Sequence, residues 1–398
     1  MSQAAMRTER PVILVPVLRE YHSGLWLGGR NYVLSWMHAL ETLPPSERPR
    51  IIVAAAPAAP ADLVAELFKR SSAILLFNMQ GRIDDMKPAL RRWLKRHGAN
   101  AAERLRRLFD SVVASFPVLG PGMQVPRPLF WIPDFQHRRL PDQFSERERA
   151  ERDRIYGLIA AKNERLILSS RDVLKDFREF YPESAVRPHV WSFVSSLDPS
   201  VVPPEDPRPR FGLPDKYLYL PNQFWRHKNH ITAIRALSIL RANGIDATLV
   251  CTGSPLDYRW PDHFSRVQQA IGTANLNDRV RYLGIVSREQ QIQLFRYAAA
   301  VIQPSLFEGW STVVEDTKAM GRPLIASDIP VHREQADART LFFRPTDPED
   351  LAAVVARIYG DLRPGPDLAM EMEATQTRIS RQKSAAREFM RIATSLPH

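Results

Sequence analysis

The chain has almost no cysteine and no long apolar run. Cys251 is the only cysteine among 398 residues, so we expect neither a disulfide framework nor a cysteine-based zinc site. No stretch reaches the roughly 18 apolar residues that a spanning helix needs, and the apolar run at 12–15 is too short for a signal-peptide core. Internal repeats and a convincing Asp-x-Asp loop are also missing. We therefore expect a cytosolic protein without a metal cofactor.

Acidic residues are outnumbered, which leaves a net charge of +11. Residues 87–107 hold eight Lys or Arg against one acid. Their helical spacing around a few apolar residues is typical either of a solvated helix face or of a helix lying on anionic lipid, so we expect peripheral contact with the inner face of the cytoplasmic membrane as one possibility. No zinc-finger, RNA-binding-sheet or helix-turn-helix signature accompanies the charge, which argues against nucleic acid.

Short apolar runs alternate with amphipathic segments along most of the chain. This alternation predicts parallel sheets covered by helices on both faces, and the length suits two or three domains. In the first half, we expect strands at 12–15, 51–55, 74–77, 129–132 and 165–169, and helices at 31–40, 150–162 and 171–180. In the second half, we expect strands at 217–220, 247–252, 280–283, 300–303 and 324–327, and helices at 230–243, 264–273, 288–298, 312–320 and 351–359.

Six prolines between 199 and 214 separate the two halves. Proline is excluded from helix interiors and central strands, so this segment is predicted to be an interdomain linker. We predict a Rossmann-like domain at 1–198, the linker at 199–214, a second Rossmann-like domain at 215–375, and a C-terminal helix at 376–398 that packs back on the first domain.

The most informative segment is 304–316, where a predicted strand leads through a glycine-containing turn into a helix. Backbone N–H groups and the helix dipole favour phosphate at such a place. Carboxylates on the turn and in the first helical turn, from Glu308 and Glu315, can accept hydrogen bonds from sugar and ribose hydroxyls. The spacing Thr312-x-x-Glu315 is also that of a capping box, which is the structural alternative for Glu315.

This segment resembles the signature of glycosyltransferase family 4, whose members are retaining enzymes of the two-domain GT-B fold. The family pattern has two glutamates separated by seven residues, whereas Glu308 and Glu315 are separated by six, in a shortened form of the pattern. The resemblance implies that Glu308 lies near the donor sugar and that Glu315 binds ribose. It also implies that the diphosphate lies on the backbone of Gly309, Trp310, Ser311 and Thr312.

The loop at 220–230 also follows a predicted strand. Fixed cations can stabilise a departing diphosphate as an oxyanion hole does, and Arg226 and Lys228 could supply that charge. The resembling family carries an Arg five residues before the Lys, but that position is Gln223 here, so Arg226 is the expected substitute. Asn222 in the same loop is expected to contact the donor.

The segment 131–137 contributes Asp134 and His137 after a first-domain strand. The resemblance implies a histidine near the sugar at this position. We expect His137 to face the cleft and bond the sugar, with Asp134 orienting it or binding the acceptor.

Smaller signals complete the predicted donor site. The glycine pair Gly28-Gly29 precedes a helix and allows close backbone approach to a ligand. Gly253 and Ser254 follow a strand and are expected to line the nucleotide pocket. The resemblance implies a base contact at the turn that contains Val286.

Together these features predict a metal-independent retaining hexosyltransferase, for example a mannosyltransferase, that moves a sugar from a GDP- or UDP-sugar. The expected acceptor is a saccharide or lipid-linked saccharide in surface polysaccharide or lipopolysaccharide synthesis. Lys228, Arg226 and the helix N-terminus would stabilise the leaving group. Three alternatives stay open: a GT-B nucleotide-sugar epimerase, a basic binding protein for lipid or nucleic acid, and a non-catalytic member of the family.

Overall fold

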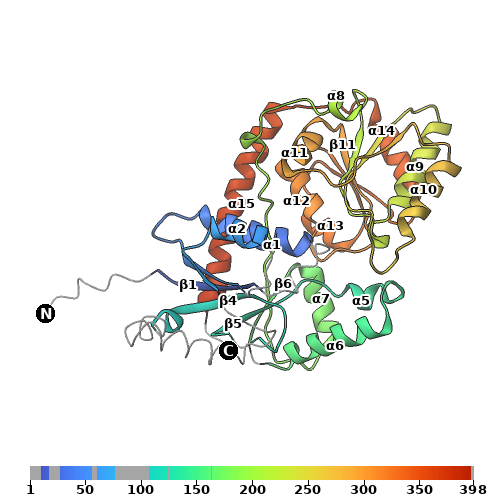
Figure 1. Ribbon diagram of the computed structural model, residues 1–398. Helices are drawn as coiled ribbons and strands as arrows, with labels where there is room; N and C mark the ends of the chain where they lie inside the picture. The colour runs from blue at the N-terminus through green and yellow to red at the C-terminus, as the bar shows by residue number, and fades with distance from the viewer. Residues whose placement is uncertain are drawn as a thin grey trace.

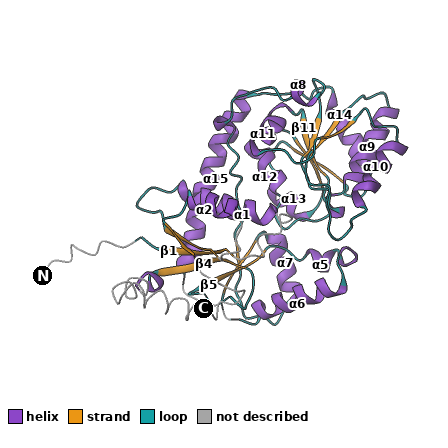
Figure 2. Ribbon diagram, viewed as in Figure 1, coloured by secondary structure: helices purple, strands orange, loops and turns teal. Residues whose placement is uncertain are grey.

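The computed structural model describes residues 10–17, 27–55, 61–76, 107–123, 125–162 and 164–395. They form two α/β domains, each built on a parallel sheet with helices packed against it (Figures 1 and 2). The fold class thus agrees with the one that the alternating pattern predicts. The basic segment 87–107 falls outside the described residues except for Arg107, so the predicted membrane contact stays untested.

The N-terminal sheet has seven strands in the order β3-β2-β1-β4-β5-β6-β7. All its pairings are parallel. The strands are β1 (Val12–Val17), β2 (Arg50–Ala55), β3 (Ala73–Leu76), β4 (Val112–Val118), β5 (Pro128–Ile132), β6 (Arg165–Leu168) and β7 (His189–Val190). The helices are α1 (Leu27–Glu41), α2 (Ala61–Phe68), α5 (Gln136–Arg139), α6 (Glu146–Ala160) and α7 (Arg171–Phe180).

The C-terminal sheet has six parallel strands in the order β10-β9-β8-β11-β12-β13. The strands are β8 (Leu218–Leu220), β9 (Leu249–Cys251), β10 (Val280–Tyr282), β11 (Ala300–Gln303), β12 (Leu324–Ser327) and β13 (Thr340–Phe343). The helices are α9 (His230–Ala242), α10 (His263–Thr273), α11 (Arg288–Tyr297), α12 (Thr312–Ala319), α13 (Pro330–Gln335) and α14 (Pro348–Tyr359).

Each sheet reverses its strand order next to its first strand, between β1 and β4 and between β8 and β11. Such switch points leave a crevice at the carboxyl ends of the strands, where ligands of open α/β sheets bind. In the C-terminal domain, the loops that flank this crevice are 221–229 after β8 and 304–311 after β11. These are the two loops on which the sequence places its strongest candidates.

Two segments connect the domains. The proline-rich linker contains only the short helix α8 (Arg208–Phe211) and one 3-10 turn. The long helix α15 (Leu368–Thr394) starts on the C-terminal domain and ends in the N-terminal one, as its red ribbon shows in Figure 1. It is continuous across residue 375, where the sequence analysis places a domain boundary.

Aromatic packing holds the end of α15 on the N-terminal domain. The Phe389 ring lies 5.0 Å from the rings of Trp36 and Phe116 and 5.6 Å from that of Trp191. Arg165 on β6 donates to the carbonyl of Ala393 in the last turn of the helix. Such a donor satisfies carbonyl groups that a helix end leaves unpaired, so the position of α15 is fixed at its C-terminal end.

Candidate functional site

Lys228 and Glu308 face each other at the switch point of the C-terminal sheet. Lys228 closes a one-turn 3-10 helix that ends at Asn229, whose φ of 57° is left-handed. The Asn229 side chain donates to the carbonyls of Pro304 and Pro345 and so ties the two loops together. The Lys228 ammonium lies 2.6 Å from a Glu308 carboxylate oxygen, and their side chains are 18% and 9% exposed. The structure therefore brings together the residue predicted to stabilise the leaving group and the residue predicted to bind the sugar.

Gln303, the last residue of β11, is a site residue that the sequence analysis missed. Its side chain is fully buried. Its amide nitrogen donates to Glu308 at 2.9 Å and to the Ser311 hydroxyl at 2.9 Å, while its amide oxygen accepts from Asn222 at 2.6 Å. Gln303 thus fixes the orientation of Glu308. A polar residue at the carboxyl end of a predicted central strand was the available signal.

The N-terminus of α12 has the form of an anion site. Ser311 caps the helix by accepting from Val314 N–H, so the cap is Ser311 and not the Thr312 of the capping-box alternative. The Ser311 N–H is bound by the Gln335 side chain at 2.8 Å. The N–H groups of Gly309, Trp310 and Thr312 make no hydrogen bond within the part of the chain that the structure describes. Free N–H groups at a helix N-terminus suit phosphate.

Buried ion pairs argue against the prediction that Glu315 binds ribose. Its side chain is fully buried, and its carboxylate pairs with Lys318 at 3.3 Å and with Arg381 of α15 at 3.0 Å. Burial alone would raise the pKa of this carboxyl, but the charges of Lys318 and Arg381 outweigh it and lower the pKa. Glu315 therefore fastens α12 to α15.

Asp316 occupies the position that the family pattern requires, because seven residues separate it from Glu308. Its carboxylate is buried and accepts from the Ser195 hydroxyl and, at 3.0 Å, from Arg288 at the start of α11. Successive helical residues point about 100° apart, so Asp316 projects in a different direction from Glu315. The family spacing is complete in this chain, with Asp in place of the second Glu.

Arg226 points across the cleft in the structure. Its guanidinium stacks on the Trp260 ring at 4.4 Å and lies 3.2 Å from the Asp142 carboxylate of the N-terminal domain. A neighbouring contact has the same character, since Arg259 stacks on the N-terminal Phe144 at 4.5 Å. Both arginines thus join the domains at the cleft, and the Arg226 guanidinium is engaged by Trp260 and Asp142.

Gly309 lies directly against the N-terminal domain. A Cβ atom at this position would come within 2.2 Å of the Pro133 carbonyl oxygen and 2.9 Å of Asp134 Cβ. Only glycine permits this approach. On the next residue, the Trp310 indole donates to the Phe193 carbonyl at 2.9 Å. The glycine turn that leads into α12 is therefore also a direct contact between the domains.

The prediction that His137 faces the cleft is wrong, whereas Asp134 lies there beside Gly309. The His137 ring is buried between Phe144 and Tyr156, and its Nε2 lies 2.9 Å from Asp153. Burial lowers the pKa of His137 despite the carboxylate. Asp134 instead accepts from Gln136 N–H at 2.9 Å. His137 is thus a core residue that Asp153 orients.

The loops after β9 and β10 form the remaining wall of the C-terminal crevice. Gly253 has φ 136°, and a Cβ there would come within 2.3 Å of the Asn222 carbonyl oxygen, so this position also requires glycine. The Gly253 N–H donates to the Gly284 carbonyl at 2.9 Å, and Ser254 accepts from Phe224 N–H. These bonds place Val286, two residues after Gly284, in the same wall. In the N-terminal domain, Gly28 and Gly29 lie in the first turn of α1, after β1.

Within the described residues, no cluster of His, Cys, Asp and Glu is arranged to hold a metal ion. Among the same residues, no helix is long and apolar enough to cross a membrane.

Three buried histidines give the C-terminal domain a predictable pH response. Burial lowers the pKa of His230 to about 3 and that of His332 to about 4, and it lowers the pKa of His227 well below its ordinary value. The unfolded chain binds these protons near pH 6.5, so stability is present above that pH and is lost as pH falls toward 4. Each histidine contributes about 1.4 kcal/mol per pH unit in this window.

Urea unfolding followed from pH 7 to pH 4 measures this response. The variant His230→Phe keeps a ring against Phe224, on which His230 stacks at 4.0 Å. As the pH falls, the free energy of unfolding should decrease less steeply in this variant than in the wild type. The expected difference between the two slopes is about 1.4 kcal/mol per pH unit. Identical slopes for the two proteins would contradict the assignment.

The two parallel sheets, each with a switch point at the carboxyl ends of its strands, have the architecture of the two-domain GT-B fold. Residues 205–372 match the family model "Glycosyl transferases group 1". This match covers less than half of the chain and includes the segment 304–316, in which the sequence resembles glycosyltransferase family 4.

Two curated proteins match shorter parts of the chain. The O-antigen chain mannosyltransferase RfbU of Salmonella typhimurium is 26% identical over 144 residues, which cover 36% of this chain and 38% of the relative. The D-inositol 3-phosphate glycosyltransferase of Streptomyces scabiei is 32% identical over 118 residues, which cover 29% of this chain and 24% of the relative. The matches thus span well under half the length of these relatives.

Solved structures match nearly the whole chain. HepE from Anabaena, in complex with UDP and glucose, aligns over 97% of this chain and 100% of its own at 16% identity, with a TM-score of 0.68. A glycosyltransferase from Rickettsia africae aligns over 97% of this chain and 98% of its own at 16% identity, with a TM-score of 0.66. WaaG, a glycosyltransferase involved in lipopolysaccharide biosynthesis, aligns over 97% and 100% at 14% identity, with a TM-score of 0.56. At these identities the likeness establishes the fold, and the predicted GT-B architecture is confirmed.

Proposed function

We propose that this protein is a retaining glycosyltransferase that moves a hexose from a nucleotide-diphosphate sugar to a saccharide acceptor. The observation that carries the proposal is the pairing of Lys228 with Glu308 beside the free N–H groups at the start of α12. A departing diphosphate gains negative charge in the transition state, and a fixed cation with helix N–H groups stabilises that charge. The match of residues 205–372 to the family model "Glycosyl transferases group 1" supports the same reaction class.

Each residue of the site has a place in this reaction. Glu308, oriented by Gln303, accepts hydrogen bonds from the sugar hydroxyls. Lys228 and the N-terminus of α12 bind the diphosphate. Asp134 lies across the cleft beside Gly309, where an acceptor would enter. By analogy with the family that the sequence resembles, we propose same-face attack, in which the diphosphate takes the acceptor proton.

The finer assignments are also proposals. The curated relative RfbU is an O-antigen chain mannosyltransferase, and WaaG acts in lipopolysaccharide biosynthesis, so we propose a mannosyl donor and a surface-polysaccharide acceptor for this chain. The HepE complex holds UDP and glucose, which keeps UDP-sugars beside GDP-sugars as candidates. We also propose that the reaction needs no metal, because Lys228 and the helix terminus supply the positive charge.

Release of nucleoside diphosphate tests the proposal. The protein is incubated with a panel of GDP- and UDP-sugars, with and without a saccharide acceptor and EDTA, and the products are separated. We expect one donor to be consumed only with acceptor present, with the anomeric configuration retained and no effect of EDTA. Donor isomerisation without acceptor would instead support an epimerase.

Asp316 and Glu315 are adjacent but should behave differently when replaced. We propose that Asp316 takes the ribose-binding role, so Asp316→Ala should weaken nucleotide binding by roughly tenfold or more, the worth of one hydrogen bond to a charged group. Glu315→Ala leaves Lys318 and Arg381 without their shared carboxylate, so it should lower stability with little change in affinity. Calorimetric titration and urea unfolding of both variants distinguish the roles, and the reverse pattern would restore the ribose role of Glu315.

A further inference from the structure

Ser311, the N-cap residue of α12, uses its N–H, its carbonyl and its hydroxyl in bonds within the protein. The hydroxyl accepts from the Gln303 amide at 2.9 Å. The N–H donates to Gln335 Oε1 at 2.8 Å, and the carbonyl accepts from Gln335 Nε2 at 3.1 Å. The sequence predicts that the diphosphate lies on four backbone groups of this turn. In the structure the N–H of Ser311 is engaged elsewhere, which leaves the N–H groups of residues 309, 310 and 312 for phosphate.

The two bonds from Gln335 clamp the backbone of Ser311. Gln335 is the last residue of α13, and both residues are only 1% exposed. A buried N–H needs a partner, so an apolar side chain at position 335 would leave the Ser311 N–H unpaired. The N–H groups of the two neighbours, Trp310 and Thr312, make no hydrogen bond within the described residues. The clamp therefore fixes the backbone between two groups that remain free for a ligand.

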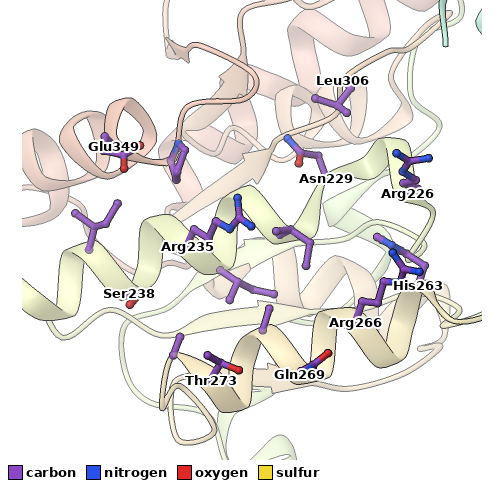
Figure 3. Close-up of a pocket in the computed structure, with 16 residues that line it drawn as sticks. Arg226, Asn229, Arg235, Ser238, His263, Arg266, Gln269, Thr273, Leu306 and Glu349 are labelled. Atoms are coloured by element: carbon purple, nitrogen blue, oxygen red, sulfur yellow. The ribbon is translucent and has the colours of Figure 1, made fainter. Parts of the chain in front are cut away.

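The same turn is fixed at its start by the loop that carries Lys228. The Leu306 N–H donates to the His227 carbonyl at 2.8 Å, and the Asn229 side chain donates to the Pro304 carbonyl at 3.0 Å. Figure 3 shows Asn229 and Leu306 where the two loops meet. The turn thus has one anchor before Glu308, from the loop after β8, and one after it, from α13.

Gln335 is itself held by both domains. Its carbonyl accepts from Lys318 Nζ at 2.7 Å. The preceding residue, Glu334, accepts from the Arg171 N–H at 2.9 Å, at the first residue of α7 in the N-terminal domain. Groups that are fixed before a charge arrives stabilise it without the cost of reorganisation. The position of Gln335 meets this condition.

We propose that Gln335 is a positioning residue for the leaving diphosphate. It acts through its clamp on Ser311, which holds the N–H groups of Gly309, Trp310 and Thr312 in place for the phosphate. The inference rests on the proposed function, because that function supplies the diphosphate. It adds a residue from α13, outside the segment 304–316 that carries the family resemblance.

The test compares Gln335→Met, which keeps a long side chain and removes both bonds, with the matched control Gln293→Met. Gln293 on α11 is also buried, and its amide donates to the linker carbonyl of Pro203. Calorimetric titration gives the dissociation constants for UDP and GDP and for UMP and GMP, which lack the second phosphate. We expect Gln335→Met to weaken binding of the diphosphate about tenfold and that of the monophosphate less than about threefold. Gln293→Met should leave the ratio of the two constants unchanged.

The ratio separates positioning from stability, because a general loss of folded protein affects both nucleotides equally. An unchanged ratio in a folded Gln335→Met protein, or an equal change in Gln293→Met, would overturn the role of Gln335 alone. A wild-type protein that binds none of these nucleotides would overturn the proposed function as well.

Hydrogen exchange in the wild-type protein, followed by NMR, tests the clamp without a substitution. We expect the Ser311 N–H to be protected before any nucleotide is added. The N–H groups of Gly309 and Thr312 should become protected only when the nucleoside diphosphate is bound. Fast exchange at Ser311 without nucleotide, or exchange at Gly309 and Thr312 that bound diphosphate does not slow, would contradict the proposal.

Discussion

Lys228→Ala should reduce the rate of sugar transfer by about 10²–10³-fold, the effect of removing one preorganised donor from a site of developing negative charge. In the structure, Lys228 has Glu308 as its partner at 2.6 Å and lies beside the N-terminus of α12. When the diphosphate departs, this ammonium is available to stabilise its charge, whereas Arg226 is bound to Trp260 and Asp142. We therefore expect kcat to fall more than the affinity for the donor.

The measurement is steady-state release of nucleoside diphosphate, with kcat and KM determined separately. Lys228→Arg keeps the charge and should recover part of the loss, although the guanidinium fork differs in shape from an ammonium. Arg357→Ala removes a cation from an exposed position on α14 and serves as the control. If Lys228→Ala lowers kcat by less than threefold in a folded protein, Lys228 does not stabilise the leaving group.

Glu371→Leu should destabilise the protein by about 3–5 kcal/mol, because it leaves a buried arginine without its counter-ion. Glu371 in the first turn of α15 accepts from Arg296 Nε at 2.9 Å, and their side chains are 7% and 3% exposed. Arg296 also donates to the linker carbonyl of Val202 at 2.9 Å. This pair therefore fastens α11, the linker and α15 at the point where the chain returns to the N-terminal domain.

Urea unfolding of the single variant and of Arg296→Met combined with Glu371→Leu separates the causes. The double variant leaves no charge buried and should recover a large part of the loss, as replacements of buried ion pairs by apolar residues do. A single variant that costs less than 1 kcal/mol, or a double variant as unstable as the single one, would contradict this account of α15.

The α/β alternation was readable from the sequence because buried parallel strands are short continuous apolar runs. One central strand, β4 (Val112–Val118), was not predicted from the sequence. Pro117 lies in this strand, and a proline argues against a central position. The ladder between β4 and β5 shifts its register between Ser115 and Val118, which accommodates the proline. That shift depends on neighbouring strands and is not visible in the local sequence.

The candidate site was predicted best where it follows a strand end directly. Glu308 and Lys228 were found because the carboxyl ends of β11 and β8 fix where their loops begin. The surroundings of Glu315 could not be predicted, because its partner Arg381 comes from α15, which is distant in the sequence. The burial of His137 was not predicted because its partners lie on a later helix. Asp153 forms a hydrogen bond with the ring and Tyr156 packs against it.

Thermal unfolding with UDP, GDP and ADP, each with and without EDTA, tests the central claim most directly. A ligand that binds only the folded state raises the melting temperature by mass action. We predict a rise with the uridine or guanosine nucleotide that EDTA does not change and that is smaller in Lys228→Ala. If a folded wild-type protein shows no rise with any of the three, the cleft is not a nucleotide-sugar site and the proposed transfer reaction is contradicted.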